Sequence, residues 1–129
     1  MTTNLRDFTV GLKAFEAEVK AAHTEQIRAV GRELLELLVQ GSPVDTGHFK
    51  ANWQVSIGRP ATGIVNGVDT DGAQTIARGE AVLRGVKAFD SVHITNNVPY
   101  GPELEEGSVQ RPPAAMVRAA VASVQGRSR

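Results

Sequence analysis

Cysteine is absent from this chain of 129 residues, and aromatic residues make up only 5% of it. Without cysteine there is no disulfide, no thiol nucleophile and no cysteine-based zinc or iron–sulfur site. The formal net charge is zero, which argues against a protein held on nucleic acid mainly by bulk positive charge. No apolar run approaches the roughly 20 residues of a membrane span, and no signal peptide is visible. We therefore expect a soluble domain inside the cell.

The scarcity of aromatic residues also limits the core. Aromatic side chains bury the most area per residue, and the chain has four Phe, one Trp and one Tyr beside 13 Gly. The hydrophobic fraction of 41% is nevertheless ordinary, so one folded domain over residues 1–129 is expected. Because its core is modest, such a domain is a candidate for completing its burial against a partner.

The strongest periodic pattern predicts one long amphipathic helix over residues 10–40. Apolar residues step by three and four, and charged residues occupy the opposite face. Gly41, followed by Ser42-Pro43, ends the helix. The apolar stripe consists of Leu12, Phe15, Val19, His23, Ile27, Val30, Leu34 and Leu38.

The length of this helix exceeds the size of the domain that carries it. About 30 residues give a helix of roughly 45 Å, whereas a compact chain of this size is about 36 Å across. Either the helix bends, with Gly31 as the weak point, or part of its apolar stripe packs on a neighbouring subunit. We favour the second interpretation.

The rest of the sequence predicts an α+β fold: a long N-terminal helix packed on a small antiparallel sheet, with a short middle helix and a C-terminal helix. Two segments of alternating apolar residues supply the strands, and Gly, Asn and Pro clusters mark the loops. In chain order we expect a strand at 49–57, a loop with a mobile tip at 58–73, a helix at 74–85, a strand at 91–96, a loop at 100–113, a helix from Pro113 and a frayed tail at 126–129.

Motifs that would indicate an enzyme or a calcium site are weak. Asp45-Thr46-Gly47 matches the short signature of aspartic proteases, but the apolar flanking strands are missing, so a turn is favoured. Asp69, Asp71 and Glu80 match only part of an EF-hand calcium loop, and a solvated acidic turn is favoured there.

The three histidines are scattered, and none has the paired spacing of a zinc site. His23 falls on the helix stripe and is expected to be a boundary residue with a hydrogen-bond partner. Neither a nucleophile elbow nor a phosphate-binding loop is present. We therefore predict no catalytic residue, cofactor or metal, and a small hydrolase using Asp45 or the histidines is kept as the alternative from another class of protein.

Opposite charges gather in the last third of the sequence. An acidic cluster precedes Gly107, and arginines follow it. Adjacent blocks of this kind suit head-to-tail contacts between subunits, and two solvated patches are the alternative. The acidic residues are Glu103, Glu105 and Glu106, and the basic ones are Arg111, Arg118, Arg127 and Arg129.

Two stretches resemble a known family. The segment SPVDTGHFKANW at 42–53 is similar to an "aPvdTG-x-L-x-x-s" motif that follows a long helix. The segment ITNNVPYGPELEEGS at 94–108 is similar to an "i-x-N-n-x-p-Y-a-x-x-l-E-x-G-x-S" motif, which a proline and a Met-Val helix start follow. In this order, over about residues 10–125, they resemble neck or tail-completion proteins of long-tailed bacteriophages and prophages. Phe49 stands where Leu is usual, and Gly101 where Ala is usual.

The resemblance implies a structural virion protein rather than an enzyme. Such proteins form rings, often of six subunits, between the tail tube and the head-side connector. We accordingly expect a homo-oligomeric ring that terminates or completes the tail and contacts the tail-tube protein and the head-completion protein. DNA would pass through its channel. A head-side stopper or adaptor in the same neck is the alternative. The chain would be located in the virion after assembly in the host cytoplasm, without contact to a membrane.

Nine residues are expected at contacts with other subunits or rings. Among them, Asn97 helps to fix a turn, and Tyr100 offers an aromatic anchor with a polar tip. Glu105 can accept hydrogen bonds from turn amides or pair with a neighbour's arginine. The loops at 58–73 and 96–112 would face neighbouring rings, and the first would become ordered on docking. The nine are Asp45, Gly47, Trp53, Asn97, Tyr100, Glu105, Gly107, Arg111 and Arg118.

Overall fold

The computed structural model describes residues 5–43, 47–107 and 115–127, and the side chains of residues 17–43, 47–107 and 115–125. Two short strands pair as an antiparallel sheet, with Val55 opposite Ile94. The predicted α+β fold is therefore confirmed. In chain order the elements are α1 (Leu5–Gly41), α2 (His48–Ala51), β1 (Gln54–Ile57), α3 (Ala73–Leu83), β2 (Val92–Thr95), α4 (Gly101–Glu106) and α5 (Met116–Arg127).

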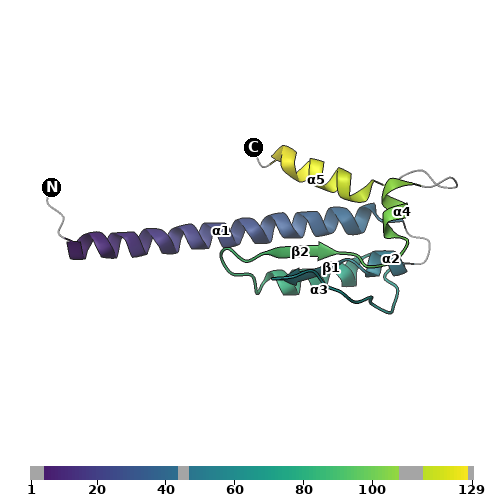
Figure 1. The fold of residues 1–129 in the computed structure, drawn as a ribbon, viewed down its shortest axis with the longest axis horizontal. Coiled ribbons are helices and arrows are strands. Elements are labelled where there is room, and N and C mark those ends of the chain that lie inside the picture. The colour runs from purple at the N-terminus through teal and green to yellow at the C-terminus, as the bar shows by residue number, and fades with distance from the viewer. Residues whose placement is uncertain (1–4, 44–46, 108–114, 128–129) are drawn as a thin grey trace.

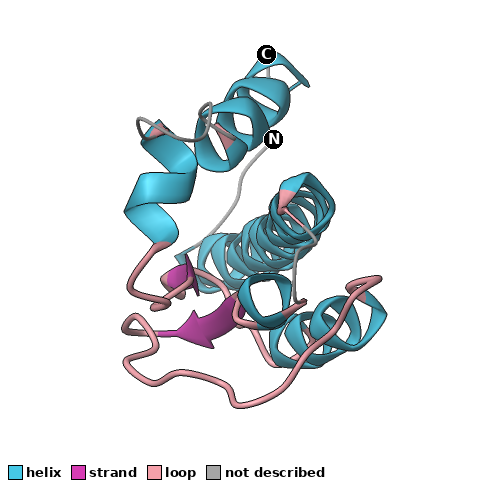
Figure 2. Cartoon of the chain, turned by 90° about the vertical axis from the view of Figure 1, so that its right-hand side faces the viewer, coloured by secondary structure: helices cyan, strands magenta, loops and turns pink. Residues whose placement is uncertain are grey.

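The other elements are arranged around the second half of α1. α3 lies on one side of α1 together with the sheet, and α5 runs antiparallel to α1 on the other side (Figures 1 and 2). The first half of α1 extends beyond all other described elements (Figure 1). The helix has 37 residues, which corresponds to about 55 Å. The expectation that the helix is longer than its domain is therefore confirmed.

Gly31 is a packing position and does not break α1. The helix is continuous from Leu5 to Gly41 and runs straight in Figure 1. A Cβ atom on Gly31 would lie 2.8 Å from Leu83 Cδ2 of α3. On α3, a Cβ atom on Gly79 would lie 2.9 Å from Val55 Cγ2 and closer still to Leu35 Cδ2. The missing side chains of these two glycines therefore allow α1, α3 and β1 to approach closely.

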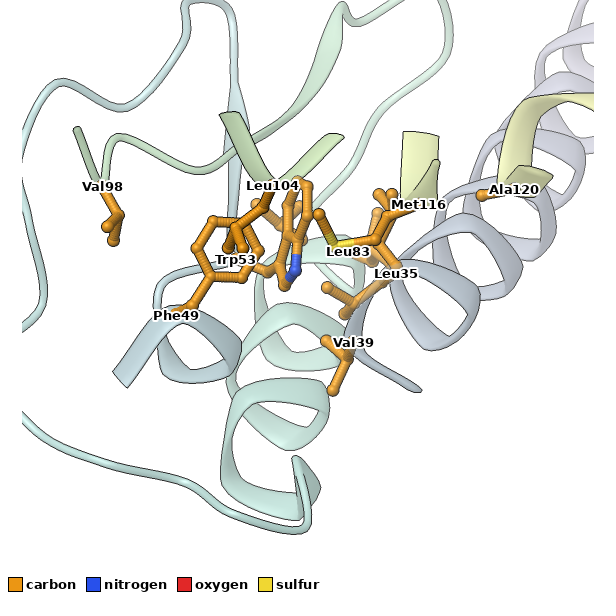
Figure 3. Packing of buried hydrophobic residues seen from close by; sticks show 11 residues of the cluster. Leu35, Val39, Phe49, Trp53, Leu83, Val98, Leu104, Met116 and Ala120 are labelled. Carbon is orange, nitrogen blue, oxygen red and sulfur yellow. The ribbon is translucent and has the colours of Figure 1, made fainter. Parts of the chain in front are cut away.

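The hydrophobic core forms where these elements meet. Leu35 and Val39 of α1 are completely buried. Phe49 and Trp53 pack edge to face with ring centroids 5.8 Å apart, and Leu104 of α4 lies against them (Figure 3). This cluster joins the end of α1 to α2, to α4 and to the residue preceding β1.

Arg28 holds the end of α3 against α1. Its Nε donates to the carbonyl of Leu83 at 3.2 Å, and its Nη2 donates to the carbonyls of Arg84 at 2.9 Å and Val86 at 3.3 Å. The last carbonyls of a helix lack partners within the helix, and a cation at that end is favourable. Arg28 therefore fixes the position of α3 along α1.

The predicted strand at 49–57 is wrong in its first half. Residues 48–51 form α2, and β1 begins only at Gln54. Phe49 and Trp53 are four residues apart, a spacing that fits a helical turn as well as a strand. Residues 49 to 53 are all buried, so the alternation of exposure that a half-buried strand would show is missing.

The predicted loop at 100–113 contains a helix, α4. Pro102 stands in its first turn, where a helix needs no N–H group and proline is tolerated. Of the remaining predictions, β2 lies within the expected range, α3 begins one residue before its expected range, and α1 begins at Leu5 rather than at residue 10. Pro113 lies outside the described residues. The first two residues of the predicted frayed tail, Gly126 and Arg127, belong to α5, and the last two lie outside the described residues. Within the described ranges, no helix has the length and apolarity needed to cross a membrane.

The substitution Gly79→Ala should lower the free energy of unfolding by about 1–2 kcal/mol, measured by urea unfolding. The added methyl group must displace Leu35 and Val55, and this overpacking outweighs the gain in helix propensity. Gly63→Ala is the control, because a Cβ atom there meets nothing within 4 Å. If both variants were as stable as the wild type, the close approach of α1 and α3 would be contradicted.

Candidate interaction surface

Two aromatic residues predicted at contacts have different roles. Trp53 is buried, and its Nε1 donates to Ser42 Oγ at 2.7 Å, while Ser42 Oγ donates to the carbonyl of Leu38 at 2.7 Å. Trp53 thus joins the start of β1 to the end of α1. Tyr100 packs its ring on Phe49, with centroids 5.9 Å apart, and remains exposed. Tyr100 is therefore the aromatic residue of this pair that a partner could contact directly.

Gly47, the residue before α2, joins this helix to the end of the loop at 58–72. Its φ of 74° lies in the left-handed region, which glycine adopts without steric cost. Its carbonyl accepts hydrogen bonds from the N–H groups of Ala51 at 3.1 Å and Asp69 at 3.0 Å. The turn predicted here is confirmed at Gly47, while Asp45 lies outside the described residues.

Side-chain amides hold the loop at 58–72. Asn52 donates to the carbonyl of Val65 at 3.0 Å and accepts the N–H of Val65 at 2.7 Å. Asn97 donates to the carbonyls of Ala61 at 2.8 Å and Gly63 at 3.0 Å. The mobile tip stays a prediction, and these bonds favour a loop with a fixed shape. They also explain the place of Asn97 in the motif, since it joins the end of β2 to this loop.

The same loop presents apolar side chains to solvent. Ile64 and Val68 are exposed, Val68 to 63% of its surface. Val65 lies between them in the chain, and Asn52 bonds both its N–H and its carbonyl. Exposed apolar groups on a loop of defined shape are typical of contact surfaces.

Asp69 organises the start of α3. Its Oδ2 accepts hydrogen bonds from the N–H and the Oγ of Thr75, both at 2.7 Å. Burial raises the pKa of the Asp69 carboxyl, but these hydrogen bonds oppose it, and the net pKa lies below the usual 3.8. Asp71 accepts the N–H of Ala73 at 3.0 Å. The expected solvated acidic turn is wrong for Asp69, which is buried; both carboxylates cap the first turn of α3.

Glu105 holds the first turn of α5. Its Oε1 accepts the N–H of Val117 at 2.9 Å, and its Oε2 accepts the N–H of Arg118 at 3.2 Å. A carboxylate is favourable at a helix N-terminus, where the N–H groups lack partners. The prediction that Glu105 accepts hydrogen bonds from backbone amides is therefore confirmed, and these amides belong to the start of a helix.

The neighbouring motif residues complete this junction. Gly107 has a φ of 89°, and its N–H donates to the carbonyl of Glu103 at 2.8 Å, which closes α4. The side chain of Arg118 is exposed and thus accessible to a partner. Arg111 lies outside the described residues.

An apolar groove runs along α1 between β2 and α5. Its volume is about 500 Å³, and most of its lining residues are apolar. The lining residues of α1 extend from His23 to Leu38, with Val92 and Ile94 of β2 on one wall and α5 on the other. We call this the α1–β2–α5 groove. It lies on the stripe of α1 that the sequence predicts to be buried.

The rim of the groove carries exposed apolar side chains. Val117 and Val121 of α5 are exposed and belong to the lining. At the other end, Phe89 stacks on His23 with centroids 4.6 Å apart and is 67% exposed. The N–H of Phe89 donates to His23 Nδ1 at 3.0 Å, and its φ of 67° is unusual for a residue with a side chain. The turn therefore holds an aromatic ring in solvent next to the groove.

The histidines do not form a common site. His23 accepts the N–H of Phe89, as expected for a boundary residue. His48 Nδ1 donates to the carbonyl of Gly67 at 3.1 Å, and His93 lies on β2, 3.4 Å from Ser91 Oγ. Within the part of the chain that the structure describes, no three His, Asp or Glu side chains are placed to hold a metal ion.

The groove is the feature that sequence reasoning missed. The apolar spacing places each apolar lining residue on the inner face of its own helix or strand, and it predicts that part of the α1 stripe packs on another subunit, but it does not predict a groove. One signal was available in α5, which carries more apolar residues than one buried face requires. Met116, Ala120 and Val124 are buried, while Val117 and Val121 are exposed.

Asp69→Asn should lower the free energy of unfolding at pH 7 by about 1–2 kcal/mol, because a neutral amide accepts weaker hydrogen bonds from Thr75. The folded-state pKa of Asp69 is below 3.8. Its stabilisation is thus present above that pH and is lost as the pH falls through the folded-state pKa. Urea unfolding at several pH values should show the difference shrinking in acid. Asp71→Asn is the control, because Asp71 is exposed and its hydrogen bond from the N–H of Ala73 is longer, at 3.0 Å, so the same change should cost less there. A difference independent of pH would contradict this account.

Glu105→Gln should loosen the start of α5. The loss of the charge at the helix N-terminus costs about 0.5–1 kcal/mol, so the amides of Val117 and Arg118 should exchange with solvent a few times faster. Hydrogen exchange resolved by NMR measures this directly. Glu106→Gln, at the exposed neighbouring position, should leave both rates unchanged; equal effects of the two variants would argue against the cap.

No family model, curated protein or solved structure matches this chain.

Proposed function

We propose that this chain is a ring-forming structural protein of the bacteriophage neck that terminates or completes the tail tube. The observation that carries the proposal is the incomplete covering of α1. Leu35 and Val39 are fully buried, whereas Val19, about four turns before Leu35, is 42% exposed. The helix also continues beyond all other described elements (Figure 1). A domain whose central helix is covered over half its length is suited to assembly with further subunits.

The contacts between the two motif segments support the proposal. Asn96 of the second motif donates to the carbonyl of Phe49 in the first at 2.9 Å, and Asn96 Oδ1 accepts the N–H of Val98 at 3.2 Å. Tyr100 packs on the same Phe49. The two segments therefore form one structural unit, which gives a physical reason for their occurrence together.

The two departures from the motif pattern lie next to each other in the structure. A Cβ atom on Gly101 would lie 3.4 Å from Cε1 of Phe49, which is an ordinary van der Waals contact. Phe49 therefore leaves room at this contact for the usual Ala as well as for Gly101. The departures are thus consistent with the same packing arrangement.

The exposed apolar groups suit contacts with neighbouring rings. Ile64 and Val68 project from a loop that Asn52 and Asn97 hold, and Tyr100 is exposed next to α4. A loop with a fixed shape loses little conformational entropy on docking. In this proposal the loop contacts the tail-tube ring or the head-completion ring.

Light scattering of the purified chain, alone and mixed with purified tail tubes, tests the proposal. We expect a ring-sized particle, or a monomer that binds the ends of tubes and is seen there by electron microscopy. Val68→Lys should weaken binding to tubes at least tenfold, because it places a charge where an apolar contact forms. Ala77→Lys, at an exposed position of α3, is the control. A monomer that ignores tubes would contradict the proposal, and binding to connectors instead would favour a head-side stopper or adaptor.

A further inference from the structure

The projecting first part of α1 and the α1–β2–α5 groove match each other. We propose that the groove of one copy receives residues 5–22 of α1 from the next copy, head to tail around the ring. We call residues 5–22 the projecting segment. This inference rests on the ring proposed above and identifies the contact that builds it.

The lengths of the two surfaces agree. The projecting segment has 18 residues by its bounds, or about 27 Å of helix. The groove follows α1 from His23 to Leu38, which is about 22 Å. A helix laid lengthwise in the groove would therefore be covered along most of the projecting segment.

The sequence of the projecting segment suits an apolar groove. It places apolar residues at spacings of three, four, three and four, the repeat of helices that pack lengthwise on one another. Within the part whose side chains are described, residues 17–22 are all exposed. The repeat consists of Leu5, Phe8, Leu12, Phe15 and Val19.

A chain cannot fill its own groove with this segment. The groove and the projecting segment belong to the same helix, which is continuous from Leu5 to Gly41 and straight in Figure 1. Folding the segment back would break α1 in its middle and leave backbone groups without partners. The occupant is therefore a second copy.

The rim adds contacts beyond the groove itself. Phe89 at one end and Val117 and Val121 along α5 are exposed, and a helix seated between them would cover all three. Burying Phe and Val side chains is favourable by the apolar area removed from water. Phe89 is held in its position by His23, so little ordering is needed on docking.

The head-to-tail arrangement follows from the polarity of the proposed ring. A ring with one face toward the tail and the other toward the head needs all copies in the same orientation, which only a heterologous contact provides. A reciprocal exchange of projecting segments between two copies would close after two subunits. The two arrangements therefore predict different products.

The absence of cysteine from the chain permits a direct test by disulfide cross-linking. The variant Leu12→Cys/Val121→Cys places one thiol in the projecting segment and one on the rim. Oxidation should give a ladder of covalent oligomers up to the size of the ring, alone or on tail tubes. The control Leu12→Cys/Ala77→Cys moves the second thiol to an exposed position of α3, away from the groove, and should give little cross-linking. A product that stops at the dimer would overturn the head-to-tail contact.

A second measurement does not depend on cross-linking. Leu12→Lys/Phe15→Lys should raise the concentration needed for self-association about tenfold or more, with helical circular dichroism retained. The control Ala17→Lys/Ala21→Lys adds the same charge on the opposite face of the helix, at two exposed positions, and should leave association unchanged. Rings that form normally in the double variant would overturn the inference and leave the proposed function standing. A wild-type chain that neither associates nor binds tubes would refute the proposed function itself.

Discussion

The packing of one long helix along its second half is the constraint on which the rest of the structure depends. α3, the sheet and α5 all pack on the second half of α1, where Leu35 and Val39 are inaccessible to solvent. Gly79 and Arg28 fix α3 against that half, the first by close approach and the second through the carbonyls at the end of α3. Since α1 is continuous, its first half projects as a direct consequence.

The sequence was sufficient to predict the elements whose pattern is long or clear. The three–four spacing of the α1 stripe and the alternation around Val92 and Ile94 gave the right element types. The error at α2 arose because Phe49 and Trp53 fit both periods over so short a segment. α4 falls in a segment predicted to be a loop from its Gly and Pro residues, although Pro102 is also at home in the first turn of a helix.

The site was predictable only in its local chemistry. The positive φ of Gly47 and the acceptor role of Glu105 follow from residue type and neighbours. The identity of the partners does not, because the amides that donate to Glu105 lie in α5, 12 and 13 residues further along the chain, and Asn97 binds a carbonyl 36 residues away. The groove is a property of how α1, β2 and α5 meet, and a single sequence carries no record of the space left between elements.

The interactions around the groove determine how much conformational entropy the groove loses when a partner binds. His23 holds the Phe89 turn at one end, Trp53 bonded to Ser42 forms part of the lining at the other, and Glu105 holds the start of α5. These walls exist before any partner arrives, so a docking helix meets a surface already in shape, and the entropy lost on binding is small. In the projecting segment, the described side chains of residues 17–22 are all exposed. Assembly through the groove would therefore bury surface of a helix that is already formed against walls that are already in place.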